Sequence, residues 1–109
     1  MEFAIRIVQL NQILTSKMKG FVMSKQVLRS GTSVGAMVRE AEHTGSKHDF
    51  IHKLAIAQKE INETLYWLEL LFKTDYINQT EYESLTLDAT ELLKLLTSII
   101  KTTKSRIYN

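Results

Sequence analysis

Residues 50–72 read FIHKLAIAQKEINETLYWLELLF, and their apolar side chains recur in steps of four or three residues. The series consists of Phe50, Leu54, Ala57, Ile61, Leu65, Leu68 and Phe72. This spacing places one apolar stripe along one face of an α-helix and is typical of the seam of a left-handed helical bundle. From residue 65 onward apolar side chains surround the helix, which predicts burial on more than one side.

Three further segments show the same helical spacing. We expect helices over residues 3–14, 21–42 and about 47–73, and a fourth that begins after residue 77. The connections between them are about four to six residues long, so neighbouring helices should run antiparallel. The sequence therefore predicts an all-α fold, an antiparallel up-and-down four-helix bundle, with residues 1–109 forming a single domain.

Glycines and capping residues mark the ends of these segments. Gly20 and Gly45 interrupt the helical pattern, and Thr15 and Ser16 could cap the segment that follows them. The other candidate caps pair a polar residue with an acid three positions later: Ser46 with Asp49, and either Asn78 with Glu81 or Thr80 with Glu83. Inside the second segment, Gly31 and Gly35 lie four residues apart on one face. Because glycine weakens a helix, the pair predicts that another backbone or a ligand comes close there.

Composition excludes several classes of protein. Apolar residues make up 44% of the chain, and it has no cysteine and no proline, so disulfides and thiolate chemistry are excluded. The first residues lack a secretory signal pattern, and charges interrupt every apolar window of the length that a membrane span needs. We therefore expect a cytoplasmic protein with no membrane partner.

The charges are divided into blocks, although the net charge is only +2. Residues 3–39 contain six basic residues and no acid, whereas residues 60–91 contain eight acids and Lys73 as the single cation. Such blocks predict either a basic surface that binds nucleic-acid phosphates or a basic helix that packs beside an acidic one. The candidate phosphate contacts are Lys17, Lys19, Lys25, Arg29, Arg39 and Lys47. Phe21 is the single aromatic residue among them in the sequence, so base stacking is not expected.

Several stretches resemble one family of small bacterial bundles. The stretches are residues 28–36 (LRSGTSVGA), 40–42 (EAE), 46–51 (SKHDFI), 63–71 (ETLYWLELL) and 91–96 (ELLKLL). In this order they are similar to the proteins encoded by intervening sequences in 23S ribosomal RNA genes. The resemblance implies an up-and-down bundle that assembles as a ring-shaped homopentamer. A related branch includes the accessory variability protein of diversity-generating retroelements, whose basic surface binds nucleic acid and a reverse transcriptase.

The chain departs from the family pattern at two positions. Met37 stands where the family usually has an amide, and Arg39 stands where it usually has alanine. Arg39 extends the basic character of the second helical segment, and any role that depends on the amide is open for this protein.

Catalytic and metal sites have little support in the residue spacing. Glu40 and His43 are three apart, and His48 and His52 are four apart, but a di-metal bundle needs a second Glu-x-x-His motif that the sequence lacks. The serines have no histidine at helical spacing and no nucleophile elbow. We expect no cofactor, no metal and no enzymatic activity.

The sequence thus predicts a self-associating, non-catalytic bundle that binds RNA or DNA, with a scaffold for a protein partner as the alternative. The apolar surface late in the third segment is the candidate interface between copies, formed by Tyr66, Trp67, Leu70 and Leu71. A homo-oligomer follows from this surface, and five copies are implied by the resemblance alone.

Overall fold

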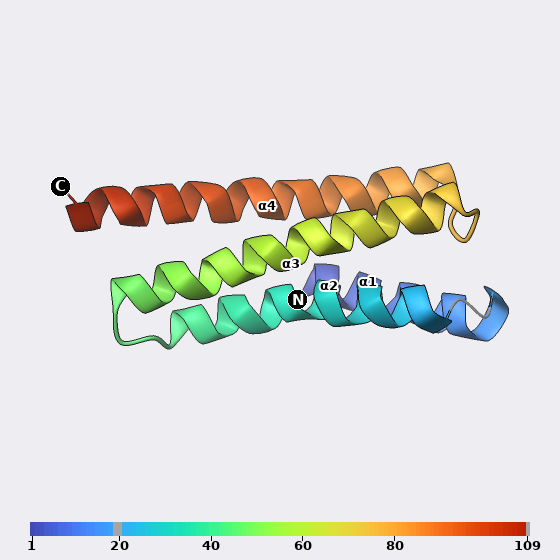
Figure 1. The fold of residues 1–109 in the computed structure, drawn as a ribbon, viewed down its shortest axis with the longest axis horizontal. Coiled ribbons are helices and arrows are strands. Elements are labelled where there is room, and N and C mark those ends of the chain that lie inside the picture. The colour runs from blue at the N-terminus through green and yellow to red at the C-terminus, as the bar shows by residue number, and fades with distance from the viewer. Residues whose placement is uncertain (19–20, 109) are drawn as a thin grey trace.

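The computed structural model describes residues 1–18 and 21–108, and these form four antiparallel helices in an elongated bundle of 51 × 21 × 19 Å (Figure 1). The helices are α1 (Glu2–Ile13), α2 (Phe21–Glu42), α3 (Lys47–Lys73) and α4 (Gln79–Tyr108), and a π-helical turn, η1 (Leu14–Met18), follows α1. The described residues contain no strand. The predicted all-α four-helix bundle is confirmed.

The predicted seam of α3 forms the centre of the core. Four residues of this seam are almost completely buried: Leu54, Ala57, Ile61 and Leu68. The same core contains Leu85, Ala89 and Leu96 of α4. Phe50, Leu65 and Phe72 pack at the margin of this core. The spacing of four and three residues therefore identifies the buried face of α3 correctly.

Two of the predicted caps are formed. Ser46 accepts a hydrogen bond from the backbone N–H of Asp49 at 3.1 Å, which satisfies a free donor at the start of α3. Asn78 Oδ1 accepts from the N–H of Glu81 at 2.8 Å, so Asn78 rather than Thr80 caps α4.

Thr15 and Ser16 do not act as caps in the described part of the chain. The hydroxyl of Thr15 donates to the carbonyl of Asn11 at 2.9 Å, and that of Ser16 donates to the carbonyl of Ile13 at 3.4 Å. Hydroxyls that bond back to the preceding turn commonly accompany an irregular helix, and here the chain continues into η1 instead of stopping. The predicted break at Gly20 lies outside the described residues.

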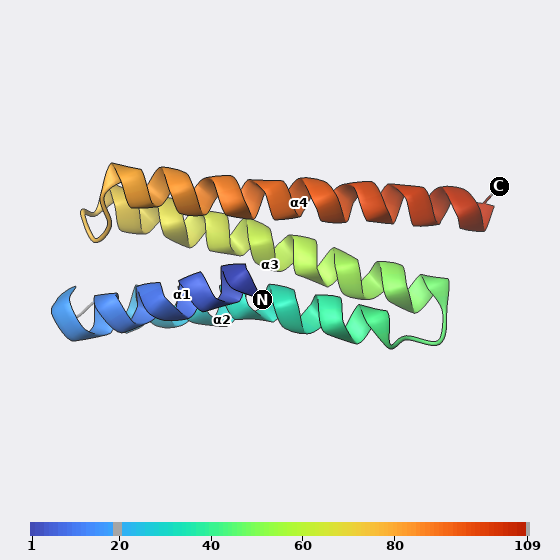
Figure 2. The same ribbon diagram turned by 180° about the vertical axis from the view of Figure 1, so that it is seen from behind.

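The helices differ in length, and this shapes the molecule. α1 has 12 residues, whereas α2, α3 and α4 have 22, 27 and 30. α1 therefore runs along only one half of the bundle, and Figure 2 shows its first residue near the middle of the long axis. In the other half, which ends at the α2–α3 loop, three helices pack without a fourth.

Gly31 and Gly35 have different surroundings. A Cβ atom at Gly31 would lie 2.8 Å from Ile7 Cγ1, so the predicted close approach is confirmed there. A Cβ atom at Gly35 would have no neighbour within 4 Å.

Candidate nucleic-acid interface

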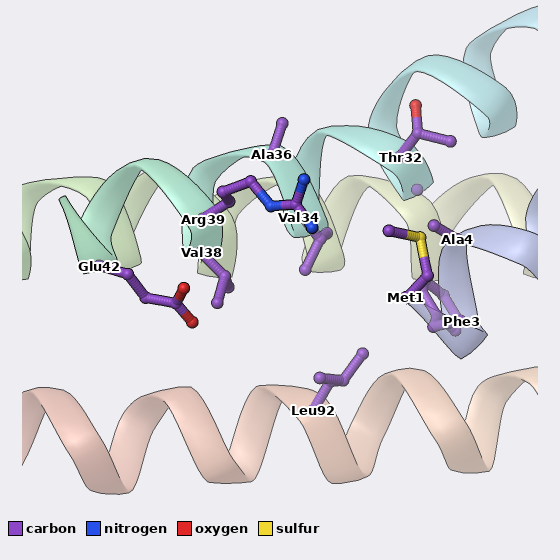
Figure 3. Close-up of a pocket in the computed structure, with 12 residues that line it drawn as sticks. Met1, Phe3, Ala4, Thr32, Val34, Ala36, Val38, Arg39, Glu42 and Leu92 are labelled. Carbon is purple, nitrogen blue, oxygen red and sulfur yellow. The ribbon is translucent and has the colours of Figure 1, made fainter.

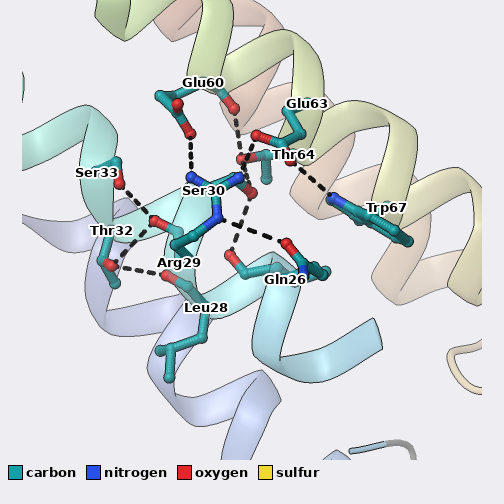
Figure 4. Close-up of polar contacts among 11 residues, drawn as sticks. Gln26, Leu28, Arg29, Ser30, Thr32, Ser33, Glu60, Glu63, Thr64 and Trp67 are labelled. Carbon is teal, nitrogen blue, oxygen red and sulfur yellow. Dashed lines mark hydrogen bonds and ion pairs between the residues drawn. The ribbon is translucent and has the colours of Figure 1, made fainter. Parts of the chain in front are cut away.

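Arg29, a predicted phosphate contact, is held by two carboxylates of α3. Its guanidinium forms an ion pair with Glu60 at 3.1 Å and a second one with Glu63 (Figure 4). The hydrogen bond from Arg29 lowers the pKa of Glu63, and the same bond raises the pKa of Arg29. At this position the basic helix pairs with the acidic one, as the second interpretation of the charge blocks predicts.

The other predicted contacts do not form one stripe. Lys25, Arg39 and Lys47 are exposed. Lys25 lies 14 residues from Arg39 along α2, which is about 21 Å at the rise of an α-helix. Lys19 lies outside the described residues, and Lys17 belongs to η1. The structure therefore separates Lys25 from Arg39 and Lys47, which lie toward the α2–α3 loop.

Cations from three helices lie in the half of the bundle that ends at that loop. The end of α2, the start of α3 and the end of α4 lie together there because the helices are antiparallel (Figure 1). Residues 36–60 and 93–108, which we term the basic end, contain eight lysines and arginines against four acids. The remainder of the chain contains six cations against eight acids, so positive charge is concentrated at one end of the long axis.

Most cations of the basic end are available to a partner. Lys53 is paired with Glu40 at 3.4 Å. The other seven are exposed and form no ion pair within the described part of the chain; they are Arg39, Lys47, Lys59, Lys94, Lys101, Lys104 and Arg106. Only Arg39 and Lys47 among them were predicted contacts.

Some of these cations have a structural role as well. Arg39 and Arg106 lie in the last turns of α2 and α4, where a positive charge stabilises the negative end of the helix dipole. Lys47, Lys59 and Lys94 are not in a last helical turn and have no such role. The basic end therefore carries more positive charge than is required to stabilise the helix dipoles of α2 and α4.

The three histidines of the chain, His43, His48 and His52, also lie at the basic end, and all three are exposed. No group of three or more potential metal ligands occurs among residues 1–18 and 21–108. Glu40, the carboxylate of the Glu-x-x-His motif, is instead paired with Lys53.

The small polar residues of α2 make internal contacts. Ser30 is buried and accepts a hydrogen bond from the hydroxyl of Thr64 on α3 at 2.8 Å. The hydroxyls of Thr32 and Ser33 donate to carbonyls one turn earlier in α2. Ser30 therefore lies at a contact between α2 and α3.

The four residues of the predicted interface between copies differ in their exposure to solvent. The side chain of Tyr66 is 59% exposed and stands edge-on to Trp67, with ring centroids 5.0 Å apart. Trp67 is half-buried and donates to Glu63 at 3.4 Å, and Leu70 is half-buried. Leu71 is completely buried in the core of its own chain, so it is not part of the surface as the sequence suggested.

No helix in the described ranges has the length and the apolar character that crossing a membrane requires.

Comparison with known proteins identifies a family and a solved relative. The family model described as 23S rRNA-intervening sequence protein matches residues 1–98. A crystal structure of a protein of unknown function from the S23 ribosomal protein family of Bacteroides thetaiotaomicron VPI-5482 is 62% identical in sequence. That similarity covers 92% of this chain and 93% of the other, with a TM-score of 0.91. No curated protein matches the chain.

Proposed function

The chain belongs to the family of 23S rRNA-intervening sequence proteins, and on that premise we propose that it is a non-catalytic bundle that binds nucleic-acid phosphates at its basic end. The observation that supports this proposal is the presence of seven exposed, unpaired cations from α2, α3 and α4 in one half of the bundle. The solved relative carries the name of a ribosomal protein family, which makes RNA the first ligand to test.

The chemistry of the basic end fits a contact to the phosphate backbone. Lysine and arginine side chains neutralise phosphates and release counterions, and this supplies the affinity that does not depend on sequence. Arg29 does not belong to this surface, because Glu60 and Glu63 already neutralise it. Binding should therefore fall steeply as salt rises and should discriminate little between sequences.

Self-association is part of the same proposal. Tyr66 offers exposed aromatic surface on α3 that a second copy can cover. Five copies follow only from the resemblance of the sequence to its family. In any ring, the repeated basic ends would increase the overall affinity of a weak phosphate contact through avidity. We also propose a cytoplasmic location, which the complete lack of cysteine supports.

Two matched variants test the position of the binding surface. The first removes three cations of the basic end, Lys47, Lys101 and Lys104, by substitution with glutamine. The second removes Lys17, Lys19 and Lys25, which are predicted contacts outside the basic end. Each loses the same charge, so the net effect on the whole-molecule field is matched.

Fluorescence anisotropy with structured RNA and duplex DNA at several salt concentrations is the measurement. The first variant should bind far more weakly at low salt. The slope of log K against log salt should become less steep by about three units. The second variant should keep most of the affinity. Equal losses in both variants, or no binding by the wild type at low salt, would contradict the proposal.

A scaffold for a protein partner is the second candidate function. The specific observation in its favour is the exposed Tyr66 beside Trp67, an aromatic pair of the kind that is enriched at protein interfaces. If wild type fails to bind either nucleic acid, this function takes first place.

A further inference from the structure

The outer surface of α3 carries a regular exposed stripe in the half of the bundle that holds the basic end. Its members follow one another in steps of four, three and four residues and are His48, His52, Ala55 and Lys59. On the other side of the same helix, the nearly complete burial is that of Leu54, Ala57 and Ile61. Because side chains four and three residues apart share a helix face, the exposed stripe points away from the core.

α4 has a matching stripe of its own. Lys94, Ser98 and Lys101 are separated by four and three residues and are exposed, and exposed Lys104 follows one turn later. The buried side of this part of α4 consists of Ala89, Leu96 and Ile100. Residues 93–108 contain no acid, so this stripe has no negative charge of its own helix beside it.

A hydrogen bond joins the two stripes at the surface between the helices. Gln58 Nε2 donates to Thr97 Oγ1 at 2.9 Å, and the contact is exposed. The bond sets the register of the antiparallel pair: Lys59 lies one residue from it and Lys94 three residues from it, both toward the α3–α4 loop. These two lysines are therefore at nearly the same level along the long axis.

Four lysines lie on the face that the two stripes form, and we term them the outer lysines: Lys59, Lys94, Lys101 and Lys104. Lys104 is ten residues from Lys94 along α4, which is about 15 Å at the rise of an α-helix. The outer lysines thus line about 15 Å of the bundle on two neighbouring helices.

Two other cations of the basic end lie off this face. Arg39 lines a pocket formed by residues of α1, α2 and α4, and Figure 3 shows it on α2, across from Leu92 of α4. Arg106 follows Lys101 by five residues, or about 140° around the helix. Arg39 and Arg106 therefore offer a comparison with the outer lysines within the same half of the molecule.

A double strand matches the outer lysines better than a single strand does. Over 15 Å a duplex carries about nine phosphate charges, and each separate strand carries about half as many, so lysines on two helices can reach phosphates of both strands. Proteins that bind single strands commonly add aromatic side chains on which the bases stack. Phe50 is the single aromatic side chain that the structure describes in the basic end, and it packs against the core.

We propose that the outer lysines are the phosphate-binding surface of the basic end and that their ligand is a nucleic-acid duplex. The inference rests on the proposed function and narrows it to one face of α3 and α4. His52, six residues from Gln58 toward the α2–α3 loop, continues this face, and its imidazole N–H can donate to a phosphate oxygen.

The test compares two variants and three probes by fluorescence anisotropy at several salt concentrations. Glutamine replaces Lys59 and Lys94 in the outer variant, and it replaces Arg39 and Arg106 in the matched control, so each loses two charges of the basic end. The probes are an RNA duplex, a DNA duplex of the same sequence, and one unpaired RNA strand of the same length. Circular dichroism and light scattering check that both variants keep the fold and the oligomeric state of wild type.

Wild type should bind the duplexes about tenfold or more tightly than the unpaired strand at low salt. The outer variant should lose about two units of the slope of log K against log salt with either duplex, together with most of the affinity at low salt. The control should stay within a few-fold of wild type. Equal losses in the two variants, or equal affinity for duplex and unpaired strand, would overturn this inference and leave the proposed function standing. Failure of wild type to bind any probe at low salt would overturn both.

Discussion

At the scale of single residues, Gly31 and Gly35 of α2 show that the same residue type can have different packing roles on one helix. Both weaken the helix, and both lie on the same face. Only Gly31 is opposed by α1, where Ile7 is fully buried and its branched side chain has little freedom to move. The sequence predicted a close approach at this face, but it did not show which of the two glycines would be opposed by Ile7.

We therefore expect alanine to have opposite effects at the two positions. Gly31→Ala forces the Ile7 side chain to shift and should lower the free energy of unfolding by about 1 kcal/mol. Gly35→Ala meets open space and should raise it by about 1 kcal/mol through helix propensity. Urea unfolding followed by circular dichroism measures both. The same sign of change at both positions would contradict the difference in packing.

Arg29 carries a prediction about pH. Its hydrogen bond lowers the pKa of Glu63 in the folded protein, so the pair stabilises the fold above the ordinary glutamate value of about 4.5. That stabilisation is lost as the pH falls through the lowered pKa of the folded state. Arg29→Gln should thus reduce stability at neutral pH by about 1 kcal/mol or less, because the site is partly solvated.

The difference between Arg29→Gln and wild type should shrink as the pH falls below the ordinary glutamate pKa and through the lowered pKa of Glu63, because Glu63 then becomes protonated in both. Lys25→Gln is the matched control, because Lys25 is exposed on the same helix and forms no ion pair within the described part of the chain. A constant difference between Arg29→Gln and wild type from pH 7 to pH 3 would show that the ion pair does not stabilise the fold.

At the scale of helices and loops, boundaries were the most predictable feature. Ser46 with Asp49 and Asn78 with Glu81 identify the starts of α3 and α4, because a capping side chain must precede the first free N–H groups. The end of α2 at Glu42 was predicted correctly from the break before Gly45, but the glycine is not what ends the helix. No described glycine has a positive φ, and it is the hydroxyl of Thr44 that donates to the carbonyl of Ala41 at 3.0 Å.

The cap of α3 can be tested directly. Ser46→Ala removes the acceptor for the Asp49 N–H and should cost about 1 kcal/mol, and Ser46→Asp should restore most of it. Ser98→Ala, at an exposed position within α4, serves as the control and should leave stability unchanged or slightly higher. Thermal unfolding of the three variants gives the comparison. A loss in Ser98→Ala as large as in Ser46→Ala would mean that the cap has no special role.

At the scale of the whole molecule, the sequence predicted the fold but only part of the candidate site. Arg39 and Lys47 were found from the basic block of the first half of the chain. Lys59, Lys94 and Lys101 were missed, because only the antiparallel packing of α3 and α4 brings them to the same end (Figure 1). The ion pairs of Arg29 with α3 could likewise not be predicted, because a block of like charges in the sequence does not show which side chains are in contact.

The proposed self-association can be tested at Tyr66. Tyr66→Glu places a charge on exposed aromatic surface and should shift the protein toward the 12.6 kDa monomer without unfolding it. Light scattering with circular dichroism measures both properties. Leu87→Glu is a suitable control, because Leu87 is also exposed but lies on α4. A wild type that is already monomeric at micromolar concentration would refute self-association.

The position of bound nucleic acid is the most direct test of the central proposal. Amide chemical-shift mapping by NMR, during titration with a short RNA duplex at low salt, reports each residue separately. The account predicts the largest changes at residues 39–53, near Lys59 and over residues 94–106, with little change around Lys25 and Arg29. Changes centred on residues 22–33, or none anywhere at low salt, would contradict it.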